Sequence, residues 1–242
     1  MQITVKNLHY KINEERSIRI DDWTLPEGKS TLVCGPNGSG KSFLAQILCG
    51  KLKPDSGHIH LSKPNKVAWV SFELEEEILA EDRYNNDSEF IEGGLDQGRT
   101  TQEIIGEGES LHQISRMIGI SHILERPYKS ISTGECRKVL IAKALMLNPE
   151  LLILDEPFGG LDIKSREEIS GLIDHLIEQG IQILLFDFYN NSLPPAIDHL
   201  VYLTDGQILL EGNRKQITES DRWNQLTDKQ IQLPHHLPDC IQ

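Results

Sequence analysis

The chain has 242 residues, of which 38% are hydrophobic and 6% aromatic, and it carries a formal net charge of −13. A chain of this length can bury a sizeable core, as one large domain or as one domain with a smaller subdomain. A net negative charge argues against binding of nucleic acid or anionic lipid through the overall charge of the protein. We therefore expect no nucleic-acid partner.

The cysteines and the lengths of the apolar runs indicate the cellular compartment. Cys34, Cys49, Cys136 and Cys240 form no CxxC pair, which favours reduced thiols in a cytoplasmic protein and no structural metal. The longest apolar runs, "LLIL" and "IQILLF", are far shorter than the roughly 20 residues that a membrane-spanning helix needs.

In chain order, the first clear unit is a strand, a glycine-rich turn and a helix. "STLVCG" is typical of a buried strand, and "KSFLAQILCG" predicts a helix that Gly50 ends. The turn between them, "GPNGSGKS" at residues 35–42, matches the pattern G-x-x-x-x-G-K-S/T in the context that this pattern requires. A merely glycine-rich turn is the alternative.

This turn predicts a phosphate-binding loop. Backbone N–H groups and the helix N-terminus would cradle phosphates, the Lys41 ammonium would neutralise the β and γ oxygens, and the Ser42 hydroxyl would bind Mg²⁺. The expected nucleotide-binding residues here are Gly35, Pro36, Asn37, Gly38, Ser39, Gly40, Lys41, Ser42 and Phe43.

The middle of the chain is strongly acidic. Residues 73–110 contain 13 acidic and two basic side chains, which predicts an inserted, solvated segment. A helical pattern follows from Leu111 to about Tyr128 and leads into "ISTGECRK". There Ser132 and Glu135 form a capping box that needs no ligand, so the helix start alone leaves a structural and a ligand-binding interpretation open.

A second buried strand, "LLILD", ends in Asp155 and is followed by Glu156. Two carboxylates there are costly unless they serve a cation or a proton. We expect Asp155 to bind Mg²⁺ and Glu156 to polarise an attacking water as a general base. The alternative is that Glu156 only caps the turn before Pro157. A helix and the strand "IQILLF" follow, which predicts an α/β fold with an open, mostly parallel sheet.

The segments "GPNGSGKS", "ISTGE", "LLILDEP" and "GGLD", in that order and spacing, resemble an ABC-type ATPase domain. The resemblance implies a P-loop NTPase (RecA-like) core, an N-terminal antiparallel β subdomain and an inserted α-helical signature subdomain, with ATP and Mg²⁺ as cofactors. It also implies that Ser132, Gly134 and Asp162 meet a nucleotide held by a second ABC domain in a head-to-tail pair.

"SFEL", "GRTTQEII", "YKSISTGECRK" and "LLILDEPFGGLD" are similar to the N-terminal half of the tandem ModF-type ABC proteins. This resemblance implies a link to molybdate transport and a second ABC ATPase domain, as a tandem half or in a homodimer. A membrane permease is a further expected partner, which would bring a cytoplasmic protein to the inner face of the membrane.

Several positions depart from the family pattern. Thr133 and Glu135 replace the usual residues around Ser132 and Gly134, and Phe43 replaces a hydroxyl residue that touches the α-phosphate. Phe72 and Glu73 occupy the place of a glutamine that senses Mg²⁺ and membrane partners, which puts coupling to a permease in doubt.

The residues expected to stack on adenine and to position the attacking water also differ from the family pattern. Tyr10 is a candidate to stack on adenine, although Ile12 aligns better with that position. Phe188 stands where the family has a histidine that contacts the γ-phosphate, and we expect Asp187 to face away from the phosphate. The nearest histidines, His175 and His199, are displaced by more than ten residues.

The expected organisation divides the chain into four parts. Residues 1–72 and 131–225 form the ATP-binding core, the second part including the signature helix, 73–130 form the inserted subdomain, and 226–242 form a tail or linker. Two functions stay open. One is an ATPase that closes on a second domain with a weakened hydrolytic site, and the other is a nucleotide-gated regulatory module uncoupled from a permease.

Overall fold

The structure, a computed structural model, describes residues 1–71, 73–84, 98–189 and 193–231. Its centre is a six-stranded sheet in the order β5-β6-β7-β3-β8-β9, in which only β9 runs antiparallel to its neighbour. These strands are β3 Thr31–Cys34, β5 Val67–Ser71, β6 Leu151–Asp155, β7 Gln182–Phe186, β8 His199–Thr204 and β9 Gln207–Asn213. The predicted α/β fold with a mostly parallel sheet is confirmed.

The central strands are covered on both faces, which is why their sequences are continuous apolar runs. Every residue of β6 and β7 is buried. Successive side chains of a strand point to opposite faces, so Leu151 and Ile153 pack with helix α1 (Lys41–Leu48). Leu152 and Leu154 join the second core, which contains the buried faces of α5 and α6.

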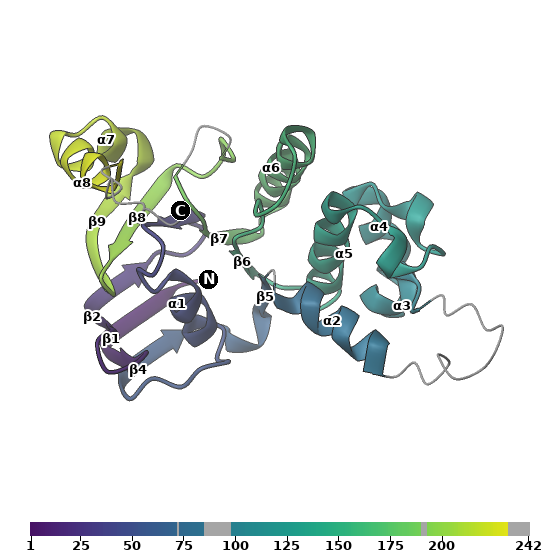
Figure 1. The fold of residues 1–242 in the computed structure, drawn as a ribbon, viewed down its shortest axis with the longest axis horizontal. Helices are drawn as coiled ribbons and strands as arrows, with labels where there is room; N and C mark the ends of the chain where they lie inside the picture. Colours follow the sequence, from purple (N-terminus) through teal and green to yellow (C-terminus); the bar gives the residue numbers. More distant parts are fainter. Residues whose placement is uncertain (72, 85–97, 190–192, 232–242) are drawn as a thin grey trace, which may run out of the picture.

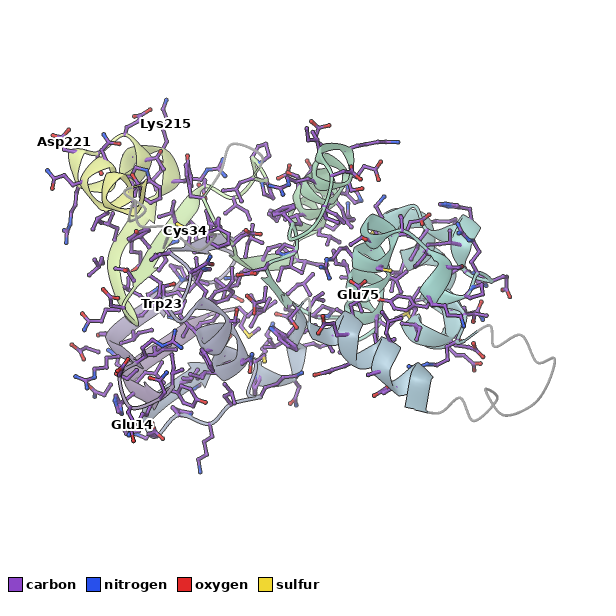
Figure 2. All side chains as sticks on the ribbon, viewed as in Figure 1. Glu14, Trp23, Cys34, Glu75, Lys215 and Asp221 are labelled. Carbon is purple, nitrogen blue, oxygen red and sulfur yellow. The ribbon has the colours of Figure 1, made fainter. Side chains whose placement is uncertain are left out.

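The predicted N-terminal β subdomain is a three-stranded antiparallel sheet in the order β2-β1-β4. Its strands are β1 Ile3–Lys11, β2 Ser17–Leu25 and β4 Ser56–Leu61, and Figure 1 shows them beside α1. Trp23, labelled in Figure 2, is 2% exposed and donates from Nε1 to Glu211 Oε1 over 3.2 Å. This bond joins the small sheet to β9 of the large one.

A helical part lies at the opposite end of the molecule from the small sheet (Figure 1). Within the predicted helical stretch, α4 ends before Gly119 in a left-handed conformation (φ 79°), and two short 3₁₀ turns follow. Residues 85–97 of the acidic segment lie outside the described part of the chain. The elements are α2 Glu73–Tyr84, α3 Thr101–Ile105, α4 Leu111–Ile118, η3 Ser121–Ile123, η4 Tyr128–Ser130 and α5 Thr133–Leu145.

An ion pair with a buried arginine connects α2 to α5. The Arg137 side chain is 2% exposed and the Glu75 side chain 15%, and the Arg137 guanidinium lies 3.0 Å from Glu75 Oε2. Figure 2 labels Glu75 where α2 meets α5. Because leaving a buried guanidinium without its carboxylate is costly, this pair helps to hold α5 against the inserted segment.

The remaining helical elements include a short 3₁₀ turn before β5 and three helices on the side of β7, β8 and β9 (Figure 1). They are η1 Pro64–Lys66, α6 Ile163–Glu178, α7 Arg214–Thr218 and α8 Asp221–Ile231. The tail predicted from residue 226 thus begins within α8, and residues 232–242, with Cys240, lie outside the described residues. Over the described ranges, no helix is both long and apolar enough to cross a bilayer.

Candidate functional site

The glycine-rich turn connects the end of β3 to the start of α1. Gly38 and Gly40 adopt left-handed conformations with φ of 77° and 101°, which side-chain-bearing residues rarely adopt. At Gly35 a Cβ atom would lie only 1.8 Å from the Leu203 carbonyl oxygen on β8. The turn therefore needs glycine both for its conformation and for its close approach to β8.

The start of α1 fits an anion. Its N-cap is Gly40, no side chain caps it, and no acidic residue lies in its first turn. The first N–H groups of a helix have no intrahelical acceptor and carry a partial positive charge. A phosphate is an acceptor of the right charge for them.

Lys41 lies inside this turn rather than in solvent. It is 5% exposed, and its ammonium donates to the carbonyl oxygens of Gly35 (3.0 Å) and Pro36 (3.1 Å). Burial lowers the pKa of Lys41, and the carboxylates of Glu156, Asp187 and Asp155 act in the opposite direction. A polyphosphate would meet a cation already held at the loop.

Ser42 and Asp155 meet at the end of β6, 113 residues apart in the sequence. The Ser42 hydroxyl donates to Asp155 Oδ1 over 3.1 Å, and the Asp155 side chain is buried. A hydroxyl and a carboxylate oxygen are hard ligands of the kind that Mg²⁺ prefers, with the remaining positions filled by water and phosphate. The pair therefore fits the expected magnesium ion.

Glu156 follows Asp155 in a left-handed backbone conformation (φ 51°), which is unusual for a residue other than glycine. Its N–H donates to the Phe186 carbonyl over 2.8 Å, which holds the turn against β7. The side chain lines a hollow of about 140 Å³ together with Asn37, Lys41 and Ser42. A carboxylate that lines the same hollow as Lys41 and Ser42 is compatible with the general base predicted for Glu156.

Asp187, which we predicted to face away from the phosphate, is buried. The residue is 5% exposed, and it interacts electrostatically with Glu156 and Lys41; its direction relative to a bound phosphate stays a prediction. Oδ1 accepts the Phe188 N–H over 2.6 Å, whereas Oδ2 makes no hydrogen bond of normal geometry to the described residues. Burial raises the pKa of Asp187 to about 6, and the negative charge of Glu156 acts in the same direction.

Asp187 is buried because it directly continues β7. Its N–H donates to the Val33 carbonyl on β3 over 3.2 Å, so the strand carries the side chain into the protein. No local sequence signal distinguishes this buried aspartate from one on an exposed turn.

Phe188 lies against Lys41, the lysine predicted to bind phosphate. The Lys41 ammonium is 4.5 Å from the centroid of the Phe188 ring, which is within cation–π range. The Phe188 residue is 40% exposed and lines a hollow of about 340 Å³ with Tyr189, Tyr202 and Trp223. An aromatic ring that can neither donate nor accept a proton therefore stands at this side of the loop.

Tyr10, the candidate to stack on adenine, packs beside Phe43. Its ring centroid lies 6.0 Å from that of Phe43, and both rings pack on the core between the two sheets. Ile12 and Arg16 instead line a hollow of about 140 Å³ beside Ser39, and Tyr10 lines neither this hollow nor the one at Glu156. Stacking of adenine on Tyr10 stays a prediction.

The signature segment, "ISTGE" at residues 131–135, leads into α5, and the predicted capping box is confirmed. Ser132 Oγ accepts the Glu135 N–H over 3.3 Å, and Glu135 accepts the Ser132 N–H over 2.8 Å. Asp162 caps α6 by accepting the Ser165 N–H over 2.8 Å. Ser132, Gly134 and Asp162 do not line the hollows beside the phosphate-binding loop described above, so the structure does not bring them to the nucleotide site of their own chain.

Phe72 lies outside the described residues, and the Glu73 side chain is likewise not described. The replacement of the family glutamine by Phe72 and Glu73 therefore rests on the sequence.

Comparison with known proteins agrees with this geometry. The profile of the ABC transporter family matches residues 18–159. The ABC transporter ATP-binding protein ModF of Escherichia coli K12 is 32% identical over 234 residues, which cover 93% of this chain and 48% of that protein. The molybdate/tungstate import ATP-binding protein WtpC of Thermococcus kodakarensis is 36% identical over 160 residues, covering 63% of this chain and 47% of the relative.

Among solved structures, an ATP-binding cassette of an ABC transporter in its ADP conformation superposes with a TM-score of 0.72. The sequences are 23% identical, and the match covers 96% of this chain and all (100%) of that chain. The likeness establishes the fold. The chain spans about half the length of both ModF and WtpC. From the family profile and the ModF match, the chain belongs to the ABC transporter family and contains its ATP-binding domain.

Proposed function

We propose that this chain binds Mg-ATP at the β3–α1 loop and hydrolyses it slowly. ATP-binding domains of the family are ATPases that bind ATP, normally with Mg²⁺. The uncapped start of α1 and the buried ammonium of Lys41 support binding of the β and γ phosphates. Ser42 and Asp155 would hold the Mg²⁺ ion, which neutralises phosphate charge and orients the nucleotide when bound.

Glu156 would act as the general base. Its carboxylate lines the same hollow as Lys41 and Ser42, where it could accept a proton from a water molecule placed beside the last phosphate. The strained backbone of Glu156 and its hydrogen bond to Phe186 would keep the carboxylate at that position. Asn37 and the loop glycines would exclude further water from the phosphates.

The observation that carries the slow hydrolysis is the contact of the Phe188 ring with Lys41. The resemblance to ABC domains implies a histidine here that contacts the γ-phosphate and holds the attacking water. Phenylalanine has no group for either task. Binding would survive this replacement because the phosphate contacts come from other residues.

A second ABC domain would complete each site. Domains of this family work as dimers and with membrane permease partners in transporters. Ser132, Gly134 and Asp162 would face the nucleotide of that second domain, whether it is a tandem half or a second copy. The capping box keeps the Ser132 hydroxyl at the helix start, and the match to about half of ModF supports a tandem arrangement.

We propose molybdate as the transported species on the similarity to the molybdate/tungstate import protein WtpC and on the resemblance to ModF-type proteins. The alternative is a nucleotide-gated regulatory module that closes on ATP without driving a permease. Phe188, together with Phe72 and Glu73 in place of the expected glutamine, favours this alternative.

The experiment that tests the proposal is ATP binding and turnover by the chain alone and mixed with its candidate second half. We expect calorimetric binding of Mg-ATP, turnover below about 1 per second, and stimulation on mixing. Lys41→Ala should abolish most of the binding and leave the fold intact. Unchanged nucleotide affinity in that variant would contradict the proposed site.

A further inference from the structure

Arg16 and Gly38 both line the two hollows described above beside the glycine-rich loop. Arg16 lines the hollow that contains Ile12 and also the hollow that contains Lys41 and Glu156. No other side chain from the β1–β2 hairpin lines the second of these. The Arg16 side chain therefore lies between the hollow at Ile12 and the hollow where we expect the phosphates.

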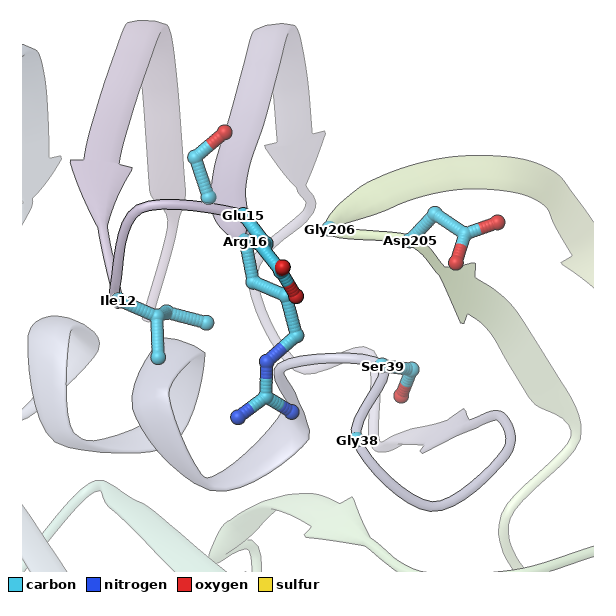
Figure 3. Close-up of a pocket in the computed structure, with 8 residues that line it drawn as sticks. Ile12, Glu15, Arg16, Gly38, Ser39, Asp205 and Gly206 are labelled. Carbon is cyan, nitrogen blue, oxygen red and sulfur yellow. The ribbon is translucent and has the colours of Figure 1, made fainter.

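The guanidinium lies directly against the loop. A Cβ atom built on Gly38 would be 3.2 Å from Arg16 Nη1, so only a glycine leaves the guanidinium this close without displacement. Figure 3 shows the side chain extending from the hairpin toward Gly38 and Ser39. Its donors thus face the same loop backbone that would hold the nucleotide.

The hairpin backbone holds Arg16 in this place. Asn13 Oδ1 accepts the N–H groups of Glu15 (3.0 Å) and Arg16 (2.8 Å), and the Arg16 carbonyl accepts those of Ile12 (2.9 Å) and Asn13 (3.2 Å). A short loop fixed by four hydrogen bonds loses little freedom when its side chain binds a ligand. The backbone from which the exposed Arg16 side chain extends is therefore preorganised.

The Arg16 guanidinium makes no ion pair with any of the described residues, even though Glu15 and Asp205 line the same hollow. In a chain of net charge −13, an arginine left without a carboxylate partner beside an anion-binding loop indicates an anion as its partner.

We propose that Arg16 binds the polyphosphate of the nucleotide, as a second cation beside Lys41. This inference rests on the proposed ATP binding and adds a residue to it. A guanidinium is a planar fork of donors that matches phosphate oxygens in two parallel hydrogen bonds. Arg16 would replace the phosphate contact that is absent at Phe43, whose ring packs against Tyr10.

Inorganic tripolyphosphate and ATP distinguish a phosphate contact from a contact with the base. Binding of each, with Mg²⁺, is measured by calorimetry for wild type, Arg16→Ala and Arg16→Lys. We expect Arg16→Ala to weaken both ligands by the same factor of about ten, because one charge-assisted contact is lost. Arg16→Lys should lose less, since the charge stays and only the fork is removed.

Arg19→Ala is the matched control. Arg19 is exposed on the same hairpin but lines a different hollow, with Asp21 and Gln207, so its removal should leave both affinities unchanged. Circular dichroism checks that each variant is folded. A comparable loss in Arg19→Ala would mean that general charge, and not the position of Arg16, is responsible, which overturns the inference.

Two other results would overturn it as well. If Arg16→Ala weakens ATP but not tripolyphosphate, the guanidinium meets the base or the ribose. If it weakens neither ligand while Lys41→Ala weakens both, Arg16 has no part in binding and the proposed function stands. If Lys41→Ala also leaves both affinities unchanged, the proposed ATP site itself fails.

Discussion

Gly134, the second residue of α5, lies directly against Ser165 in the first turn of α6. A Cβ atom at Gly134 would be 2.8 Å from Ser165 Oγ and 3.0 Å from Ser165 Cβ. Ser165 in turn donates to Asp162 from its N–H (2.8 Å) and its hydroxyl (3.1 Å). The signature segment and the Asp162 segment, which we propose face a partner's nucleotide, are therefore held together within one domain.

Gly134→Ala should destabilise the protein. The added methyl group must displace Ser165, and inserting a methyl into a packed contact costs about 1–3 kcal/mol. Urea unfolding measures the change. The double variant Gly134→Ala/Ser165→Gly should recover part of the loss, because both close atoms are removed.

Gly171→Ala serves as its control. Gly171 lies within α6, and a Cβ atom there would meet nothing within 4 Å, so alanine should stabilise the helix by about 0.5–1 kcal/mol. Equal destabilisation by both substitutions would show that the Ser165 contact is not the cause.

Glu156→Gln should keep the affinity for ATP and favour the two-domain closed state, because water activation is lost while the phosphate contacts survive. An already small turnover should fall only modestly. Light scattering with and without ATP measures the association, alone and with the candidate second half.

Glu178→Gln is a suitable comparison, since Glu178 is exposed at the end of α6. The trans role of Ser132 would be contradicted if the Glu156→Gln variant shows no ATP-dependent association with either partner.

Phe188→His should raise the turnover at least about tenfold, because a positioned histidine can hold the water and contribute to proton transfer. The ring would stand beside Lys41, where the Phe188 centroid is 4.5 Å from the ammonium. Steady-state ATP hydrolysis under saturating Mg-ATP is the measurement.

Tyr189→His tests whether any nearby imidazole suffices. Tyr189 packs edge-on against Trp223, with 4.9 Å between ring centroids, so histidine there should not raise the rate. A wild-type turnover of about 1 per second or more would refute the weakened site directly.

Asp187→Asn should stabilise the protein at neutral pH. The folded state raises the pKa of Asp187 from 3.8 to about 6, so between these values the folded state binds more protons and stability falls as pH rises. The substitution should therefore gain up to about 3 kcal/mol at pH 7.5, as an upper bound. The gain should shrink as the pH falls through 6 and disappear below about pH 4.

Urea unfolding at several pH values measures this gain. The asparagine can still accept the Phe188 N–H, so the turn is preserved. Asp21→Asn, at an exposed position on β2, is the comparison. A gain that does not depend on pH would mean that the charge of Asp187 is not its source.

The sequence by itself determined the features whose information is local. The spacing of glycines before Lys41 identified the glycine-rich turn between a strand and a helix, and "LLILD" identified a strand buried on both faces with Asp155 at its end. Ser132 and Glu135, three residues apart, determined the capping box that the structure contains. These patterns depend on backbone conformation and side-chain period, which neighbouring residues set.

Only the tertiary structure decided the contacts between distant segments. It buried Asp187, although a polar residue after a strand is equally compatible with an exposed turn. It also brought Arg16 of the hairpin against Gly38 and paired Arg137 with Glu75. Such contacts depend on how the sheets and helices pack across long stretches of chain, and no spacing within a short segment encodes that packing.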